Sequence, residues 1–392
     1  MSLTPEQEAI RDSFAEFARR EVAPGAAGRD RDGEFPAGLV RRLGELDGMG
    51  ISVPETDGGL GLDTVAQLLA IEQVAYADAA LASVYTAHYL GLEVFRVRAA
   101  GAQRERWLAP LARGEFLAGF ALTEPGAGSD IAAMATTARR ARADSEGDGW
   151  VLNGTKTFIS NAAEAGVLAL FASTDPARKF RGISAFAVPR GTPGVSFSAP
   201  QRKSGLRSAP TYTVYLDDVR LPAGALLGEP GTGGATAMEV LNAARIDIAA
   251  MANGIAARAL DLAVSYAAQR EQFGAPIADF QAVQLLLGQM DAELQAARLT
   301  AAWAAAERDR QAPLRRPGSI AKYLATETCF RVVDAALQVH GGAGYMEESE
   351  IERLYRDCRV LRIYEGTSQI QLLTIARQLT SGRVTAGRGG SR

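Results

Sequence analysis

The sequence predicts a multidomain α+β fold made of three successive parts, and three observations support this prediction. Residues 1–115 carry helical spacing of apolar residues, residues 116–230 carry short β-type runs between Gly, Pro and Asp turns, and residues 231–381 return to long helical patterns. We therefore expect a helical N-terminal domain, a middle antiparallel β-barrel or sandwich, and a C-terminal four-helix bundle. Residues 382–392, rich in Gly, Arg and Ser, are expected to form a disordered tail.

The N-terminal domain opens with a clear helix start. Thr4-Pro5-Glu6-Gln7 is a capping box with proline at the first helical position. The apolar residues Ile10, Phe14 and Phe17 follow it at three- and four-residue spacing, as on one face of a helix. Further helices are expected over residues 38–46, 64–99 and 104–112.

The middle domain is predicted from its strand signals. Asn153-Gly154 stands between two of the β-type runs and is typical of a type I′ hairpin turn. Strands are expected over residues 116–122, 150–153, 156–159, 167–172, 184–188, 195–197 and 212–216.

The C-terminal domain is predicted from long apolar stripes. One stripe alternates three- and four-residue steps over three heptads, which is typical of a helix-bundle seam. It consists of Phe280, Val283, Leu287, Met290, Leu294, Ala297 and Ala301. A second stripe runs from Ile320 to Leu337, and Pro313 and Pro317 are expected to bracket a basic linker between the two helices.

Composition argues against several classes of protein. A net charge of -3 and a pI near 5.7 give no nucleic-acid-binding footprint. Cys329 and Cys358 lie far apart in apolar patterns, and His88 and His340 are the only histidines, so we expect neither a disulfide framework nor a metal site. The sequence shows no basic-then-apolar leader and no uncharged apolar run of membrane-spanning length. We expect a soluble, cytoplasmic protein that binds neither nucleic acid nor membrane.

A carboxylate near the C-terminus is the first candidate for chemistry. In the run Tyr364-Glu365-Gly366-Thr367-Ser368-Gln369, an apolar segment ends at Glu365, and a glycine and two hydroxyl residues then open a helix. A carboxylate at such a junction can be partly desolvated, which raises its pKa toward the range of a general base. Taken alone, a Glu stabilised by the dipole of the following helix is the commoner meaning.

A glycine-rich loop follows a predicted strand over residues 122–130. Pro125, Gly126 and Gly128 force a tight, exposed turn, and Thr123 and Ser129 add hydroxyl groups. Such a loop can present backbone N–H groups to a planar or phosphorylated ligand, although a purely structural turn would have the same composition.

Six motifs, in order, resemble the acyl-CoA dehydrogenase family over about residues 3–380. They are the loop at 122–130 and the runs Asn-Gly-Thr-Lys-Thr-Phe-Ile-Ser-Asn at 153–161, Asp-Asp-Val-Arg-Leu-Pro at 217–222, Gln-Arg-Glu-Gln-Phe-Gly at 269–274, Gln-Val-His-Gly-Gly at 338–342 and Ile-Tyr-Glu-Gly-Thr-Ser-Gln at 363–369. The resemblance implies the family's three-domain fold and an FAD-dependent enzyme that converts an acyl-CoA thioester into the trans-2-enoyl thioester.

The resemblance implies a role for each matching residue. Glu365 matches the family's base, which takes the proton α to the thioester carbonyl while flavin N5 accepts the β-hydrogen as hydride. The enolate oxygen would be held by the backbone N–H of Glu365 and by a ribityl hydroxyl of FAD. Ala244 is not a Glu, so the alternative helix position used by some family members does not supply the base here.

Two groups of residues match the family's FAD contacts. Those around the isoalloxazine are Phe120, Leu122, Thr123, Gly128, Ser129, Phe158, Ile159 and Ser160, and those near the base are Thr367 and Gln369. Contacts that the family makes across a subunit interface match Arg270, Gln272, Phe273, Phe280, Gln281, Gln338, Gly341 and Gly342. The resemblance therefore implies at least a dimer, and we expect a homotetramer.

The substrate and the electron acceptor are also implied by the resemblance. Thioester or pantetheine contacts match Ser129, Asn242, Arg245 and Gly366, with Asn242 standing where a medium-chain-type enzyme has Asp. The bulky residues of the helix that lines the acyl pocket in the family favour a short or branched chain; they are Tyr85, His88, Tyr89 and Leu92. We expect electrons to pass to an electron-transfer flavoprotein in fatty acid or amino acid catabolism.

Several alternatives remain open from the sequence. A thioester on an acyl carrier protein has the same reacting end as acyl-CoA, and no motif separates an oxygen-using relative. A DNA-binding relative that keeps FAD would need a basic C-terminal surface. Glu365 disfavours the nitroalkane oxidases, which carry Asp, and the absence of Arg from residues 78–91 disfavours a glutaryl-type enzyme.

Overall fold

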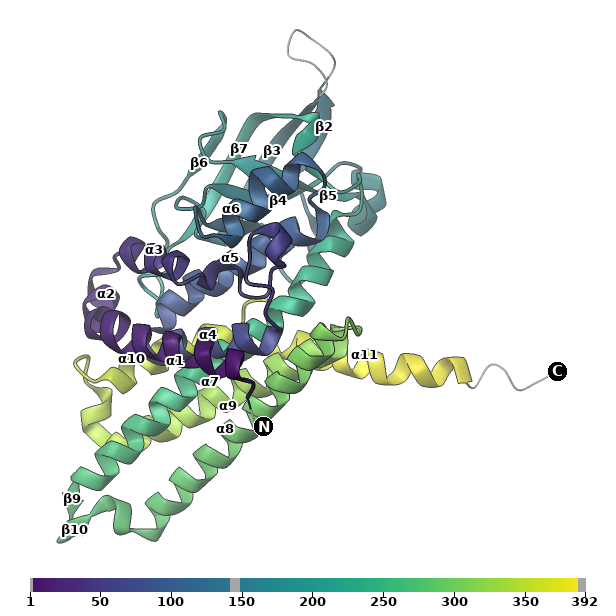
Figure 1. The fold of residues 1–392 in the computed structure, drawn as a ribbon. Coiled ribbons are helices and arrows are strands. Elements are labelled where there is room, and N and C mark those ends of the chain that lie inside the picture. Colours follow the sequence, from purple (N-terminus) through teal and green to yellow (C-terminus); the bar gives the residue numbers. More distant parts are fainter. Residues whose placement is uncertain (1–2, 142–148, 387–392) are drawn as a thin grey trace.

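The computed structural model describes residues 3–141 and 149–386, and it has the three-part order that the sequence predicts (Figure 1). The sheet domain lies at the upper end of the molecule in Figure 1, and the long helices of the C-terminal part extend to the lower end. The N-terminal helices lie beside the junction of these two parts.

The N-terminal part is helical, as predicted. Its helices are α1 (Pro5–Phe17), α2 (Ala26–Asp32), α3 (Ala37–Glu45), α4 (Thr64–Ala77), α5 (Ala79–Arg98) and α6 (Ala109–Ala112). The capping box is confirmed, since the Thr4 hydroxyl accepts the Gln7 N–H and the Gln7 side chain accepts the Thr4 N–H. The single helix expected over 64–99 is wrong. Asp78 has an extended backbone and its carboxylate accepts the N–H groups of Ala80 and Leu81, so it ends α4 and caps α5.

The middle part forms one sheet of eight strands. The strands are β1 (Ala118–Ala121), β2 (Thr137–Ala141), β3 (Gly149–Ser160), β4 (Val167–Ser173), β5 (Ile183–Pro189), β6 (Val195–Phe197), β7 (Thr211–Pro222) and β8 (Leu226–Leu227). They pair in the order β6-β7-β3-β2-β4-β5-β8, with β1 also on β4. Most pairs are antiparallel, as predicted, but β1 and β2 each pair with β4 in parallel.

The hairpin predicted at Asn153-Gly154 is wrong, because β3 runs straight through both residues. Gly154 has φ +149°, and a Cβ there would lie 2.5 Å from the Thr136 hydroxyl oxygen. The Asn153 side chain donates to Asp218 Oδ1 and accepts the Asp218 N–H, each at 2.9 Å. The Asn-Gly pair therefore forms a bulge that joins β3 to β7, and its glycine is needed for close packing.

The C-terminal part is built on long helices. They are α7 (Gly233–Gln269), α8 (Gln281–Asp309), α9 (Arg315–His340), α10 (Glu350–Cys358) and α11 (Ser368–Ala386), and the short strands β9 (Glu271–Gln272) and β10 (Ala275–Pro276) join α7 to α8. The predicted seam of α8 is buried from Met290 onward and only half-buried before it. The basic linker is shorter than expected, since α9 already begins at Arg315.

Two further predictions concern the C-terminal part. The disordered tail was expected from residue 382, whereas α11 continues to Ala386; residues 387–392 lie outside the described residues. Cys329 and Cys358 are both free and buried, as expected of core residues, but they contact each other across α9 and α10. Burial and the neighbouring Cys358 thiol raise the pKa of Cys329.

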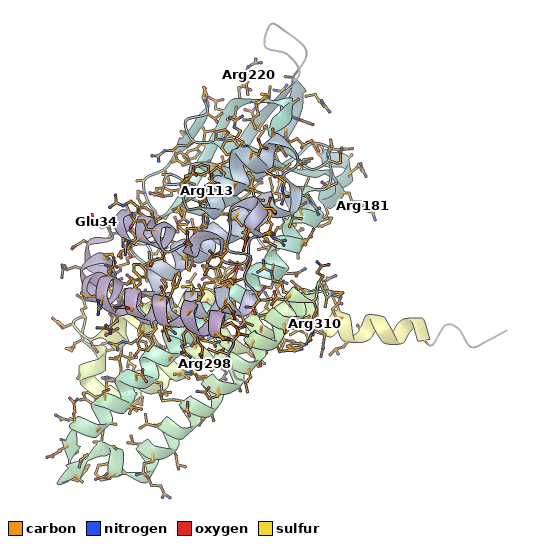
Figure 2. All side chains as sticks on the ribbon, viewed as in Figure 1. Glu34, Arg113, Arg181, Arg220, Arg298 and Arg310 are labelled. Carbon is orange, nitrogen blue, oxygen red and sulfur yellow. The ribbon has the colours of Figure 1, made fainter. Side chains whose placement is uncertain are left out.

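Helix α7 is the central helix of the C-terminal part. By length and composition it could cross a membrane, but 72% of its apolar window is buried inside the protein, so it is a core helix. Ion pairs tie the helices around it to the N-terminal domain. Arg298 of α8, labelled in Figure 2, contacts Glu72 of α4 at 2.6 Å.

Replacing Gly154 with Ala tests the bulge. The added Cβ meets Thr136 and the φ of +149° disfavours any L-residue, so we expect a loss of about 1–3 kcal/mol in the free energy of unfolding, measured by urea denaturation. Gly224→Ala is the matched control, because no atom lies within 4 Å of its added Cβ. Equal stability of the two variants would contradict the close-packing role of Gly154.

Candidate active site

The turn before α11 places Glu365 in a left-handed conformation. Glu365 has φ +52° and Gly366 has φ +94°. The Thr367 hydroxyl then accepts the Ile370 N–H at 3.3 Å and caps α11, as the sequence predicts. A non-glycine residue in this conformation stores strain that the surrounding structure must hold, and such residues cluster at functional sites.

Three side chains hold the carbonyl groups of this turn. The Glu365 carbonyl accepts Arg245 Nε at 3.5 Å and Gln371 Nε2 at 3.2 Å. The Gly366 carbonyl accepts Lys322 Nζ at 2.8 Å and Gln371 Nε2 at 2.9 Å. In the described part of the chain, the backbone N–H groups of Glu365 and Gly366 have no acceptor. They are therefore free to bind a ligand oxygen.

The Glu365 carboxyl group has the electrostatics of a base. Its Oε2 atom is enclosed and has no hydrogen-bond partner among the described residues. Burial raises the pKa of Glu365 to about 8, and the nearby carboxylate of Asp247 adds to the rise, whereas Lys322 and Arg245 oppose it. The raised pKa that the sequence suggested is therefore present in the structure.

Asp247 of α7 is a second buried carboxyl group at this site. It is 3% exposed, and its Oδ1 accepts the amide of Gln67 from α4 at 2.8 Å. Burial raises the pKa of Asp247 to about 7, although Arg308 and the Gln67 hydrogen bond lower it. The carboxylate of Glu93 adds to this rise.

A buried ion pair holds the glycine-rich loop between β1 and β2 in place. Lys156 Nζ of β3 donates to Glu124 Oε1 at 2.7 Å and to the Leu122 carbonyl at 3.2 Å. The Glu124 carboxylate also accepts the N–H groups of Ala135 and Thr136. Burial lowers the pKa of Lys156 to about 8. Burial alone would raise the pKa of Glu124, but the Lys156 ammonium and these donors bring it below its usual value.

A strained bulge in β3 presents Phe158 beside this loop. Phe158 has φ +58° and is 68% exposed, in a strand whose pairing with β7 shifts register between Lys156 and Ile159. An aromatic ring turned out of a sheet in this way offers a flat face to a planar ligand.

The predicted flavin contacts on the sheet domain differ in exposure. Thr123 and Ser160 are half-buried, and Gly128 and Ser129 are exposed. Phe120 packs against Phe171, with ring centroids 5.1 Å apart. The side chains of Leu122 and Ile159 are in the core, at 5% and 1% exposure, so a ligand beside the loop would meet mainly their backbone. Near the base, Thr367 is half-buried and Gln369 is exposed.

The second group of predicted cofactor residues lies at the other end of the C-terminal part. Arg270 ends α7, about 37 Å along the helix axis from Arg245. The His340 ring stacks on the Tyr266 ring with centroids 4.4 Å apart, which brings the end of α9 to the same place and gives His340 a packing role. The group consists of Arg270, Gln272, Phe273, Phe280, Gln281, Gln338, Gly341 and Gly342. One chain therefore does not bring the two groups together.

The predicted substrate contacts are only partly together. Arg245 Nη1 donates to Asn242 Oδ1 at 2.7 Å and to Ser319 Oγ at 3.3 Å, and its Nε reaches the Glu365 carbonyl. Burial lowers the pKa of Arg245 to about 10, and Glu365 opposes this effect. Asn242 thus orients Arg245 beside the Glu365–Gly366 turn, while Ser129 is an exposed residue of the glycine-rich loop.

Sequence reasoning missed five residues that support the site. They are Asp247, Lys322, Gln371, Glu124 and Lys156. For Asp247, Lys322 and Lys156 the available signal was a charged residue inside an apolar helix or strand pattern, because such residues are seldom fully buried without a partner. Glu124 lies in the glycine-rich loop and did not give this signal. Gln371 gave no comparable signal.

The fold combines a half-buried carboxyl group on a strained turn with a sheet domain whose open loop and exposed aromatic ring suit a flat cofactor. The family models of the acyl-CoA dehydrogenase N-terminal, middle and C-terminal domains match residues 4–115, 119–219 and 231–380. The chain belongs to the acyl-CoA dehydrogenase family, whose members depend on FAD.

The chain is similar to relatives along almost its whole length. It is 42% identical over 383 residues to the mitochondrial short-chain specific acyl-CoA dehydrogenase of Bos taurus, covering 97% of this chain and 91% of that relative. The solved butyryl-CoA dehydrogenase of Megasphaera elsdenii superposes with a TM-score of 0.94 at 35% identity, covering 97% and 99% of the two chains. A structure described as an electron transferring flavoprotein of Acidaminococcus fermentans gives 0.94 at 36% identity, with 97% and 99% covered.

Replacing Lys156 with Met tests the buried ion pair under the loop. The Glu124 carboxylate would remain buried without its cation, so we expect a loss on the order of 3 kcal/mol in unfolding free energy and a lower flavin content. The double variant Glu124→Gln with Lys156→Met removes both charges and should recover part of that stability. A double variant less stable than Lys156→Met would contradict the pairing.

Proposed function

We propose that this protein catalyses the FAD-dependent α,β-dehydrogenation of a short- or branched-chain acyl-CoA to the trans-2-enoyl thioester. The observation that carries the proposal is Glu365, a half-buried carboxyl group with an enclosed Oε2 atom and a raised pKa, on a turn whose backbone N–H groups are free. A base with a pKa near the working pH is what abstraction of a weakly acidic α-proton requires.

The proposed work of the turn has two parts. The Glu365 carboxylate takes the α-proton, and the electron pair of that C–H bond enters the new α,β double bond. The thioester oxygen gains negative charge as the proton leaves, and the free N–H of Glu365 donates to it. One residue thereby supplies both the base and an oxyanion donor.

The residues of the glycine-rich loop and of β3 fit a flavin ring system. A Cβ added at Gly126 or Gly128 would meet no atom within 4 Å, so the loop leaves open space on its outer side. Phe158 offers an exposed ring next to that loop. Thr123, Ser129, Ser160, Thr367 and Gln369 would hold the ring system through their polar groups. When bound, FAD supplies the acceptor for the β-hydride.

The short-chain assignment is supported by the relatives and by the packing of α5. The Bos taurus relative is named short-chain specific, and the Megasphaera elsdenii structure is a butyryl-CoA dehydrogenase. Tyr85 and Tyr89 are buried and donate to the Gly48 carbonyl, and His88 is buried against Met49 and Ala118. This face of α5 is filled by protein, which argues against a long acyl chain there. Neither observation favours the carrier-protein alternative.

We further propose that the enzyme is a cytoplasmic homotetramer that passes electrons to an electron-transfer flavoprotein. The wide separation of the two FAD groups along α7 supports sharing of each cofactor between chains. Exposed apolar side chains on α8, α9 and α11 support subunit contacts there; they include Leu285, Leu299, Leu324, Leu372, Leu373 and Leu379. The structural similarity to the Acidaminococcus fermentans protein supports an electron-transfer flavoprotein as the electron acceptor. The two free, buried cysteines support the cytoplasmic location, because a reducing compartment keeps thiols unpaired.

Anaerobic bleaching of the flavin tests the reaction. We expect butyryl- or isobutyryl-CoA to bleach the bound flavin rapidly and octanoyl-CoA slowly, as followed by stopped-flow absorbance. Glu365→Gln should slow bleaching about 10²–10⁴-fold with flavin content unchanged, because it removes the base and keeps the shape. Bleaching by carrier-protein thioesters alone would overturn the CoA assignment, and rapid bleaching by Glu365→Gln would overturn the base.

The pH dependence of the rate tests the charge on Asp247. Asp247→Asn removes a negative neighbour of Glu365, so the pKa of Glu365 falls and activity should persist to lower pH. The acid limb of kcat/KM reports this shift. Asp357→Asn is the control, because Asp357 is equally buried, with its pKa also raised to about 7 by burial, yet it bonds the Leu206 N–H rather than facing Glu365. An acid limb that moves to higher pH in Asp247→Asn would contradict the assignment.

A further inference from the structure

Lys322 of α9 is a fully buried lysine at the centre of the site. Lys322 has no exposed surface, and its Nζ donates to the Gly366 carbonyl at 2.8 Å. None of the ion pairs in the described part of the chain involves Lys322. Burial lowers its pKa to about 8, and the carboxylate of Glu365 opposes this effect.

A neutral donor would be enough to hold a carbonyl group. Gln371 already donates to the same Gly366 carbonyl at 2.9 Å without any charge. Burying an ammonium group is costly unless its charge is compensated, so a lysine here needs a reason beyond one hydrogen bond. That reason is the nearby Glu365 carboxylate, with which Lys322 interacts electrostatically.

The hydrogen bonds of the turn fix the direction of the free Gly366 N–H group. In a trans peptide the C=O and N–H point in opposite directions. The Glu365 carbonyl points to Arg245 and Gln371, so the Gly366 N–H points away from them. The Gly366 carbonyl is fixed in the same way by Lys322 and Gln371. The positive φ of Glu365 is thereby held although it is unfavourable for this residue.

We propose that Lys322 is a positioning residue of the dehydrogenation: its ammonium group anchors the Gly366 carbonyl, and so holds the left-handed turn that presents the Glu365 carboxylate and the adjacent N–H groups to one thioester. The proposal rests on the proposed role of Glu365 as base. Lys322 touches neither the substrate nor FAD in this account, and it acts only through the turn and through its charge.

The charge of Lys322 has a consequence for pH dependence. The ionisable groups around Glu365 are Asp247 and Arg245 from α7, Lys322 from α9 and Tyr364 from its own segment. Loss of the Lys322 charge leaves Asp247 opposed by Arg245 alone. The pKa of Glu365 then rises, and its base form is confined to higher pH.

The test is Lys322→Met, which keeps the apolar stem and removes the ammonium group. In the flavin-loaded enzyme we expect kcat to fall about tenfold to a hundredfold with little change in KM, because the turn is misplaced while substrate binding is kept. The acid limb of the pH profile should also move to higher pH. Unchanged kcat together with an unchanged acid limb would overturn the proposal.

Two further variants separate anchoring from charge. Gln371→Met loosens the same carbonyl without changing any charge, so kcat should fall and the acid limb should stay in place. If Lys322→Met fails to fold, wild-type kcat in Gln371→Met would by itself overturn the anchoring. Lys203→Met is the matched control, since this partly buried lysine also donates to a backbone carbonyl, that of Ala209 at 2.7 Å, and should leave kcat unchanged.

A readout without turnover isolates the turn from hydride transfer. Acetoacetyl-CoA has an acidic α-carbon between two carbonyl groups, so it can lose a proton to Glu365 and form a bound enolate without oxidation. We expect the ratio of bound enolate to keto form, followed by ultraviolet absorbance, to fall at least about tenfold in Lys322→Met. An unchanged ratio would overturn the proposal. A wild-type ratio and rate in Glu365→Gln would instead overturn the role of Glu365, which keeps the two failures distinct.

Discussion

The burial of α7 is the constraint on which the rest of the structure depends. Small apolar residues cover most of this 37-residue helix, so its neighbours approach closely; a Cβ added at Gly254 would lie 2.3 Å from the Glu72 carbonyl oxygen of α4. A helix held this tightly cannot shift without opening the core. Its polar residues are therefore fixed in place, with Arg245 and Asp247 beside the Glu365 turn and Arg270 at the far end.

Around Glu365, opposing effects of burial and of neighbouring charges set the pKa of the Glu365 carboxyl group. Burial and Asp247 favour the neutral acid, whereas Lys322 and Arg245 favour the carboxylate. Among the described residues, no salt bridge involves Glu365, Asp247, Lys322 or Arg245. Each of these charged groups therefore acts on the others without being neutralised by a partner of its own. The result is a carboxyl group with a raised pKa, on a turn whose geometry is held by hydrogen bonds to backbone carbonyls rather than to the carboxylate itself.

Periodicity was enough to predict the order of the three domains, and capping chemistry was enough to predict Thr4 and Thr367 as helix caps. The wrong secondary-structure predictions came from residues that are compatible with two different local structures. Asn153-Gly154 has the composition of a turn but forms a bulge, because Thr136, just before the neighbouring strand β2, packs against it. Asp78 looks like an exposed residue on a long helix but breaks it. Glu365 was singled out only through the resemblance of six motifs, because its own stretch also suits a Glu stabilised by a helix dipole. Lys322 was not singled out, because its role depends on a contact 44 residues away.

The separation of Glu365, which lies beside Arg245, from Arg270 at the far end of α7 has a genetic consequence. If each FAD is shared between two chains, a defect at Glu365 disables the site on its own chain, whereas a defect at Arg270 disables the site on the neighbour. Two inactive alleles of these different kinds, expressed together, would assemble some dimers in which one site receives an intact residue from each chain. Such mixed assemblies would recover part of the activity, and two alleles of the same kind would recover none.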